Sequence, residues 1–353
     1  MQPLIPTFPA TRYWGSKAKL VDFIWDGVRD LEFDTVLDAF GGTGVVSHMF
    51  KQRGKAVTYN DVLGFNWRFG MALIANDDKR LTDQHVEMAL DTHEPCPTFV
   101  ADTFSGIYYT DEENRWIDRV NHNINHVLPR HEPSLYVKFG LWWCLAQSCV
   151  VKRPFNLFHR ANLSHRFADV ERHAGNKTSW DTPFEVWFRR FVDQFNGAVT
   201  DGDGRCRAFC RDARLVRDQY DLVYIDPPYV SGKGQGTDYA DMYHFLEGLC
   251  DVEGWADRVD WNSRHLRMIK RNERALCEWT DPDMIVGAFW NLFERFKGSV
   301  LVVSYRSDGI PSVDQIVKLM GAFKTHVDVH QYGAYRYGFS TNRESQEVLV
   351  IGR

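Results

Sequence analysis

The chain has 353 residues, 44% of them hydrophobic and 25% charged, which is the composition of a globular protein large enough for two domains. No apolar run approaches the roughly 20 residues that a membrane span needs, and the first ten residues lack the pattern of a signal peptide, so we expect a cytoplasmic protein without a membrane partner. The seven cysteines are scattered without a Cys-x-x-Cys pair, which favours reduced thiols and no metal site. Because the net charge is −5, any contact with nucleic acid requires a local basic patch.

Near the N-terminus, residues 11–19 combine a small-residue turn with aromatic and basic side chains, among them Tyr13, Trp14 and Lys17. Apolar residues from Leu20 to Val28 follow at helical spacing, so a helix is predicted after the turn. These residues alone leave two interpretations open: the start of a helix with exposed basic side chains, or a segment that contacts a ligand.

A glycine-rich turn follows a short apolar strand at residues 35–37. It reads Asp38-Ala39-Phe40-Gly41-Gly42-Thr43-Gly44, and a helix is predicted from Val45 to about Gln52. Glycines allow the backbone to approach a ligand closely, although a turn of this kind also occurs in dinucleotide-binding proteins.

The next predicted strand, Ala56–Tyr59, ends at Asn60 and Asp61. An acid at the end of the second strand, about twenty residues after a glycine turn, is placed to accept the hydroxyls of a ribose. The alternative for Asp61 is an exposed aspartate in a loop.

The region from about residue 76 to residue 200 changes to helical periodicity. Amphipathic helices are predicted at Asp83–Leu90 and Glu113–Val127, and a buried helix at Leu135–Val151. The ten residues after the buried helix alternate basic residues with Phe and Asn. Such a run either contacts phosphates and base edges or forms a solvated basic face.

Two aspartates follow further predicted strands of the sheet. Asp212 lies two residues beyond the strand Cys206–Cys210, and Asp226 directly follows the uncharged strand Leu222–Ile225. Pro227 and Pro228 end that strand, because neither can donate a ladder hydrogen bond. Since ligands of open α/β sheets bind at the carboxyl ends of the strands, Asp226 is expected at a ligand site.

After Tyr229 comes a glycine-containing run, residues 230–236, of the kind that can order over a substrate. Residues 264–274 form a second basic candidate region. Apolar strands are predicted at Ser299–Ser304, His326–Tyr332 and Gln346–Ile351, and the loop between the last two contains Arg336.

Asp226-Pro227-Pro228-Tyr229 after an apolar strand resembles the catalytic signature of the amino-methyltransferases. Trp14–Lys17, Asp38–Gly44, Asp61 and Asp226–Tyr229 occur in the order of the Dam-like, alpha-ordered (D12 class) DNA adenine-N6 methyltransferase family. The long segment after Tyr229 departs from that pattern and is a candidate second DNA-contacting insertion.

The resemblance implies an α/β, Rossmann-like methyltransferase sheet with an inserted, mainly helical target-recognition domain. The implied domains are residues 1–75 (cofactor-binding half), 76–200 (DNA recognition) and 201–353 (catalytic half). The implied cofactor is S-adenosyl-L-methionine, contacted by Tyr13, Trp14, Lys17, Asp38, Phe40, Gly41, Gly42, Asp61 and Asp212. The expected catalytic residues are Asp226, Pro227, Pro228 and Tyr229, and the expected DNA contacts are Lys152, Arg153, Arg160, Arg166, Arg267, Arg271 and Arg336.

The resemblance also implies a mechanism. The Asp226 carboxylate and the Pro227 carbonyl would accept both amino protons of a flipped-out adenine, and the ring of Tyr229, without need of its hydroxyl, would stack on the base. Double-stranded DNA and a cognate restriction endonuclease are the expected partners. An RNA adenine methyltransferase and a catalytically silent cofactor- or DNA-binding subunit remain alternatives.

Overall fold

The computed structural model describes residues 7–168, 176–269, 278–334 and 345–353, which belong to two compact units. Unit 1 consists of residues 1–13, 71–201 and 240–270, and unit 2 of residues 14–70, 202–239 and 271–353. The chain passes between the units at residues 70/71 and 201/202, close to the boundaries at 75/76 and 200/201 that the resemblance implies. Residues 7–13 and 240–269 belong to unit 1 together with the inserted segment, whereas the resemblance implies that they belong to the catalytic halves.

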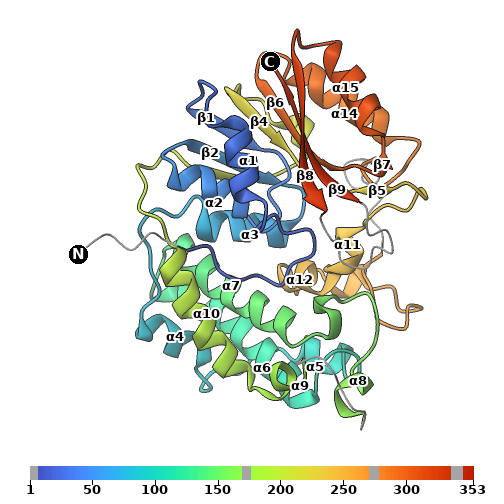
Figure 1. Cartoon of the computed structure of the whole chain (residues 1–353). Helices are drawn as coiled ribbons and strands as arrows, with labels where there is room; N and C mark the ends of the chain where they lie inside the picture. Colours follow the sequence, from blue (N-terminus) through green and yellow to red (C-terminus); the bar gives the residue numbers. More distant parts are fainter. Residues whose placement is uncertain (1–6, 169–175, 270–277, 335–344) are drawn as a thin grey trace. The chain divides into compact units, whose positions relative to one another are not determined.

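Unit 2 is built on a seven-stranded sheet with the strand order β3-β2-β1-β4-β6-β9-β8 (Figure 1). From β3 to β6 the neighbouring strands run parallel, whereas β9 runs antiparallel to both β6 and β8. The strands are β1 (Thr35–Asp38), β2 (Ala56–Asp61), β3 (Arg207–Cys210), β4 (Leu222–Ile225), β6 (Val300–Arg306), β8 (Val327–Ala334) and β9 (Gln346–Gly352), and β5 (Val230–Ser231) pairs separately with β7 (Gly309–Ile310). The predicted α/β, Rossmann-like class is confirmed.

Helices cover both faces of this sheet (Figure 1). Val348 and Val350 of β9 join the core that includes side chains of α14 and α15, while Leu349 and Ile351 face Gly27 of α1. All four residues of β4 are buried, as a strand covered on both faces requires. The helices of unit 2 are α1 (Val21–Val28), α2 (Val45–Gln52), α14 (Ile285–Arg295), α15 (Val313–Gly321) and the short 3₁₀ turn η4 (Ala213–Leu215), and α3 (Gly64–Leu73) begins in it.

The strand order reverses direction at β1. From β1 the chain moves outward to β2 on one side, and the other neighbour of β1 is β4, which comes much later in the sequence. This is the position where open α/β sheets bind ligands, at the carboxyl ends of the strands. Asp38 and Asp61 end β1 and β2, and Asp226 follows β4, so the sequence-predicted acids share this edge.

Unit 1 is helical among the residues described. Its central helix α7 (Leu135–Val151) has the bounds that the apolar run predicts, and it is buried almost all round, including Trp142 and Trp143. A Cβ on Gly140 would lie 2.8 Å from the Phe195 ring, so the glycine permits the close packing of α10 on α7. The other helices are α4 (Asp83–Leu90), α5 (Phe99–Thr103), α6 (Asp111–His122), η1 (Asn123–Val127), η2 (Leu128–Arg130), η3 (Pro154–Asn156), α8 (Ser164–Phe167), α9 (Asn176–Asp181), α10 (Phe184–Ala198), α12 (His244–Leu249) and η5 (Ala256–Arg258), with α11 (Tyr239–Met242) at the boundary of the units. No helix among the described residues is long and apolar enough to cross a bilayer.

Candidate active site

Asp226, directly after β4, is held by a buried lysine. The Nζ of Lys17 lies 2.9 Å from Oδ1 of Asp226 and 3.4 Å from Oε1 of Glu347. The side chains of Lys17 and Glu347 are only 6% and 1% exposed, whereas that of Asp226 is 15% exposed. Lys17 therefore lies at the predicted catalytic acid.

The hydroxyl of Tyr229 completes this group. It accepts a hydrogen bond from Lys17 Nζ at 2.6 Å and has two carboxylate acceptors, Oδ1 of Asp226 at 3.0 Å and Oε1 of Glu347 at 2.7 Å. Ser304 donates to the same Oε1 at 2.6 Å. We call Lys17, Asp226, Tyr229 and Glu347 the Lys17 cluster. Because the Tyr229 hydroxyl bridges it, the expectation that only the ring of this residue matters is revised.

One oxygen of Asp226 remains available. Lys17 and Tyr229 both bind Oδ1, and within the part of the chain that the structure describes no group is hydrogen-bonded to Oδ2. The carboxylate thus combines an anchored oxygen with one that is left for a substrate donor.

The electrostatics of the Lys17 cluster make Asp226 titratable near neutrality. Burial raises the pKa of Asp226 to about 6, Lys17 opposes this shift, and the charge of Glu347 adds to it. Burial alone would lower the pKa of Lys17, but its attraction to Asp226 and Glu347 outweighs that effect and holds the pKa above its ordinary value. The lysine therefore remains an ammonium over the whole pH range in which Asp226 titrates.

Glu347 was not predicted from the sequence. It lies on β9, where it pairs with Arg306 of β6, and its side chain is buried. In the sequence Glu347 stands only as an acid between Gln346 and the apolar run Val348–Ile351. Its burial, which requires partners for the carboxylate, is visible only in the fold.

The glycine turn is shaped by Tyr59 of β2. A Cβ on Gly41 would lie 2.0 Å from the Tyr59 ring, and Gly42 and Gly44 have left-handed φ angles of 51° and 85°. The Tyr59 hydroxyl donates to the carbonyl of Gly42 at 2.7 Å. These glycines are required by the packing of the turn itself, and any cofactor contact by Gly41 or Gly42 comes in addition.

Asp61 holds the same turn. Its Oδ2 accepts from the Gly42 backbone N–H at 2.9 Å and from the Asn66 amide at 3.1 Å, and its Oδ1 accepts from the Leu63 N–H at 2.9 Å. The side chain is buried at the predicted position, but its oxygens are already engaged in shaping the loop. The predicted ribose contact remains a prediction.

Asp38 has an oxygen without a partner. Its Oδ2 accepts from the Ser47 hydroxyl at 2.7 Å, whereas Oδ1 is buried and makes no hydrogen bond to any described residue. Burial raises the pKa of Asp38 to about 7, and the nearby charges of Asp226 and Asp61 add to the shift. A buried acid that is unsatisfied and surrounded by other acids fits a cationic ligand group.

Asp212 and Phe40, two further predicted cofactor residues, have partners outside the Lys17 cluster. The Asp212 carboxylate accepts from the backbone N–H of Arg214 at 2.9 Å and is paired with its guanidinium, which also reaches Glu278 at 3.0 Å. Phe40 makes an edge contact with the Trp279 ring at 4.9 Å between centroids.

Tyr13 and Trp14 of the N-terminal segment belong to different units. Tyr13 stacks on Tyr243 within unit 1, with centroids 4.6 Å apart, whereas Trp14 is half-buried in unit 2. Their predicted contact with the cofactor remains a prediction.

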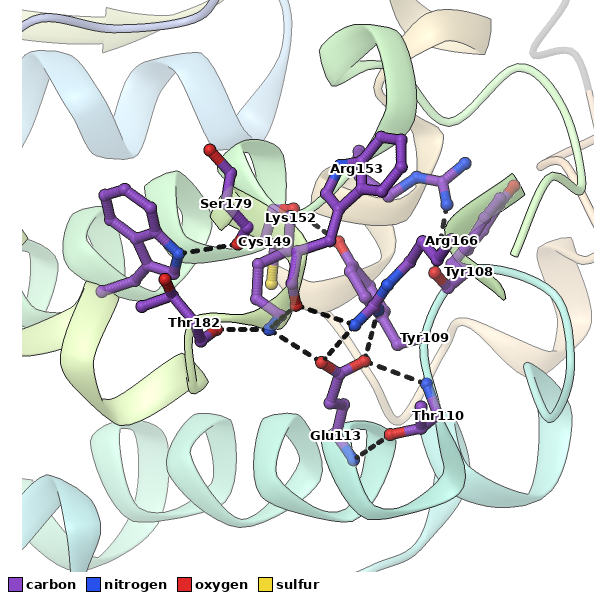
Figure 2. Close-up of polar contacts among 12 residues, drawn as sticks. Tyr108, Tyr109, Thr110, Glu113, Cys149, Lys152, Arg153, Arg166, Ser179 and Thr182 are labelled. Carbon is purple, nitrogen blue, oxygen red and sulfur yellow. Dashed lines mark hydrogen bonds and ion pairs between the residues drawn. The ribbon is translucent and has the colours of Figure 1, made fainter. Parts of the chain in front are cut away.

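The predicted basic patch after α7 is largely absent from the surface. Figure 2 shows Lys152 and Arg166 directed at the Glu113 carboxylate, at 2.8 Å and 2.5 Å. The Lys152 ammonium also donates to the carbonyls of Trp180 and Thr182, and Glu113 caps the start of α6 through the Thr110 N–H. We call Glu113, Lys152 and Arg166 the Glu113 cluster. The cations are buried, so the interpretation of Lys152 and Arg166 as phosphate contacts is corrected.

Arg153 is also interior, at 1% exposure. Its guanidinium donates to the carbonyls of Leu157, Tyr108 and Arg160 at 3.0–3.1 Å and lies 4.3 Å from the centroid of the Tyr108 ring. Burial lowers its pKa to about 10, which still leaves it charged at neutral pH. It braces the segment that follows α7, and its prediction as a DNA contact is corrected for the same reason.

Two of the predicted DNA contacts remain accessible. Arg160 is exposed, and Arg267 is partly exposed and paired with Asp260 at 3.2 Å. Arg271 and Arg336 lie outside the described residues. No cluster of three potential metal-binding His, Cys, Asp or Glu side chains occurs in the described ranges.

A family model described as D12 class N6 adenine-specific DNA methyltransferase matches residues 13–248. Over 255 residues, the chain is 26% identical to type II methyltransferase M2.HphI of Haemophilus parahaemolyticus, covering 70% of this chain and 73% of that protein. It is 25% identical to modification methylase LlaI of Lactococcus lactis subsp. lactis, over 96% of this chain and 54% of that protein. Type II methyltransferase M.NlaIII of Neisseria lactamica is 22% identical over 88% of both chains. Since the model spans more than half of the sequence, the chain belongs to the D12 class N6 adenine-specific DNA methyltransferase family, as its motifs predicted.

Proposed function

We propose that this protein uses S-adenosylmethionine to methylate N6 of a flipped-out adenine at a specific site in duplex DNA. The observation that carries the proposal is the Asp226 carboxylate at the end of β4, with Oδ1 anchored and Oδ2 open. Family membership supports the adenine and DNA parts of the proposal.

The edge that contains Asp226 fits this cofactor. S-adenosylmethionine supplies a methyl group on a positively charged sulfur and also has a cationic amino group. Asp38, Asp61 and Asp226 interact electrostatically at this edge, and the unsatisfied Oδ1 of Asp38 is a suitable acceptor for a cationic donor. A positive ligand would lower the pKa of Asp38 and relieve the cost of its burial.

Asp226 would act on the amino group of the base. The N6 lone pair of adenine is delocalised into the ring, and positive charge develops on N6 as it forms a new bond. An ionised carboxylate that accepts one amino proton stabilises that charge, and the Pro227 carbonyl can accept the other proton. Because Lys17 and Tyr229 hold Oδ1, the carboxylate is oriented before the base arrives.

Base flipping is required because the amino group is hidden in the duplex. The recognition function is proposed for unit 1, which contains most of the inserted segment. The relatives are named as type II methyltransferases and a modification methylase, so we also propose a cognate restriction endonuclease as a partner, with both acting in the cytoplasm on the nucleoid.

Transfer of tritiated methyl groups tests this function. Wild type should label duplex DNA but not RNA, and nucleoside analysis should find N6-methyladenine. Asp226→Ala should lose labelling, while Asp314→Ala, which removes an exposed aspartate of α15, should retain it. Labelling of RNA alone, or N4-methylcytosine as the product, would contradict the proposal.

A further inference from the structure

Two loops of unit 1, far apart in the sequence, meet at one buried hydroxyl. We call residues 153–167 the first loop and residues 258–269 the second loop. The Tyr108 hydroxyl lies 2.6 Å from the Phe158 carbonyl of the first loop and 2.7 Å from the His265 carbonyl of the second. Tyr108 is fully buried, so this contact lies beneath both loops.

The third partner at this point is His244, whose Nε2 lies 2.8 Å from the Tyr108 oxygen and 3.1 Å from the Phe158 carbonyl. Burial lowers the pKa of His244 to about 3, so the ring is neutral at physiological pH. With its proton on Nε2, the imidazole donates at this junction while the tyrosine hydroxyl donates to one of the two carbonyls. The junction therefore joins the two loops through groups that are uncharged at physiological pH.

Each loop is also braced internally. In the first loop, Arg153 binds the carbonyls of Leu157 and Arg160 from below. In the second loop, the Asp260 N–H donates to the Arg267 carbonyl at 2.8 Å and the two side chains form an ion pair. The exposed side chains of both loops are thus attached to backbone that internal hydrogen bonds hold in place.

Backbone strain in the described residues is confined to the same two loops. Three non-glycine residues there have left-handed φ angles, namely Phe155 at 62°, Asn156 at 59° and Leu266 at 50°, and no other described non-glycine residue does. Such conformations are unfavourable for residues with a Cβ and persist where the surrounding structure enforces them, most often at functional sites.

The outer surface of the loops combines exposed apolar side chains with positive charge. Phe155, Phe167, Trp261 and Ile269 are 49%, 66%, 61% and 55% exposed. Arg153 and Arg166 of the first loop are buried, so the surface charge comes from the exposed Arg160 and Arg264. Arg258 and Arg267 of the second loop are ion-paired with Asp251 and Asp260. Exposed rings beside arginines on a rigid frame match a nucleic acid, since arginines meet phosphates and rings contact unstacked bases.

We propose that the two loops form one duplex-contacting surface, in which Trp261 and Phe155 pack against bases and Arg160 and Arg264 contact phosphates. The inference rests on the proposed function, because it takes DNA as the substrate. It extends that function to a segment outside the residues matched by the family model, which end at 248. It also gives a role to the insertion after Tyr229 that the sequence left open.

Binding of fluorescent, unmethylated duplex DNA tests the surface, measured by anisotropy over a range of salt concentrations. Trp261→Ala and Phe155→Ala should each weaken binding by roughly 5- to 150-fold, the equivalent of losing one base–ring contact. The double variant Arg160→Ala/Arg264→Ala should reduce the slope of log K against log salt by about two. Trp290→Ala and Arg190→Ala, which remove an exposed tryptophan of α14 and an exposed arginine of α10, are the matched controls.

The outcomes separate this inference from the proposed function. Circular dichroism melting should be unchanged in the loop variants, because the replaced side chains are exposed. If wild type methylates DNA but the loop variants bind like the controls, the surface is wrong and the function stands. If wild type binds DNA through the loops without methylating it, the function is wrong and the surface stands. If wild type does not bind duplex DNA, both fail.

Discussion

The two units each contain a small buried ion cluster, and the clusters have opposite compositions. In unit 2, the Lys17 cluster sets one ammonium against the carboxylates of Asp226 and Glu347. In unit 1, the Glu113 cluster sets one carboxylate against an ammonium and a guanidinium (Figure 2). Burial alone would raise the pKa of either acid. Arg166 and Lys152 outweigh that effect and lower the pKa of Glu113, whereas Asp226, with Glu347 beside it, has its pKa raised.

The difference lies in how each cluster satisfies its surplus charge. The surplus cation of the Glu113 cluster is solvated by the carbonyls of Trp180 and Thr182, so the cluster is closed. In the Lys17 cluster, by contrast, Oδ2 of Asp226 has no hydrogen-bond partner among the residues that the structure describes. A closed cluster stabilises a fold, whereas an open one can act on a substrate, and variants of the two should therefore fail in different measurements.

Glu113→Ala should have the largest effect, on stability. It leaves two buried cations without their carboxylate, which typically costs about 3–5 kcal/mol. Because the pKa of Glu113 is lowered in the fold, its stabilising contribution is present above its ordinary pKa of 4.5 and is lost as the pH falls below that value. Chemical denaturation at pH 7 measures the loss, with Glu112→Ala, an exposed neighbour on α6, as the control. Equal stability of the two variants would show that the cluster is not closed as described.

Asp226→Ala should have the largest effect on catalysis. Loss of one transition-state acceptor typically costs about 100–1,000-fold in rate, and loss of a charged one costs more. DNA binding should remain, because the proposed binding surface lies in unit 1. Asp226→Asn keeps an acceptor without the charge and should fall between wild type and the alanine variant in single-turnover methyl transfer. Near-normal turnover of Asp226→Ala at saturating cofactor would remove Asp226 from the mechanism.

Tyr229→Phe should slow methyl transfer by about tenfold, the equivalent of roughly 1.4 kcal/mol, because a hydrogen bond to charged groups is lost. The ring, which Lys17 Nζ approaches to 4.6 Å from its centroid, is retained. If the residue served only to stack on the base, Tyr229→Phe would equal wild type and only Tyr229→Ala would be impaired. Single-turnover rates of the two variants distinguish these roles.

The sequence predicted best those helices and strands that a local pattern of apolar residues determines. Leu222–Ile225, Leu135–Val151 and Asp83–Leu90 have the predicted bounds, because uninterrupted apolar runs and helical periodicity identify such elements directly. Asp226 was identifiable because two prolines follow a buried strand. These signals do not depend on which residues meet in space.

The errors concern partners that are distant in the sequence. Lys152 and Arg166 look like surface residues until Glu113, some 40 to 50 positions earlier, is placed beside them. Glu347 reaches Lys17 across almost the entire chain, and no spacing rule connects them. The predicted contact of Lys17 with the cofactor remains a prediction, whereas its ion pair with Asp226 is visible only in the fold.

Glu347→Gln gives the finest test, because it alters the balance of the Lys17 cluster without touching Asp226. Asp226 must be ionised to accept the amino proton, so in wild type the rate should fall as the pH drops through about 6. The charge of Glu347 helps to raise that pKa, and its removal should therefore shift the acid limb of kcat/KM toward lower pH. Glutamine preserves an oxygen that accepts from Ser304 and Tyr229, so the geometry is retained. If kcat/KM of the variant is reduced equally at all pH values, Glu347 has a purely structural role. If the acid limb of kcat/KM moves to lower pH while the plateau value is unchanged, Glu347 tunes the pKa of Asp226.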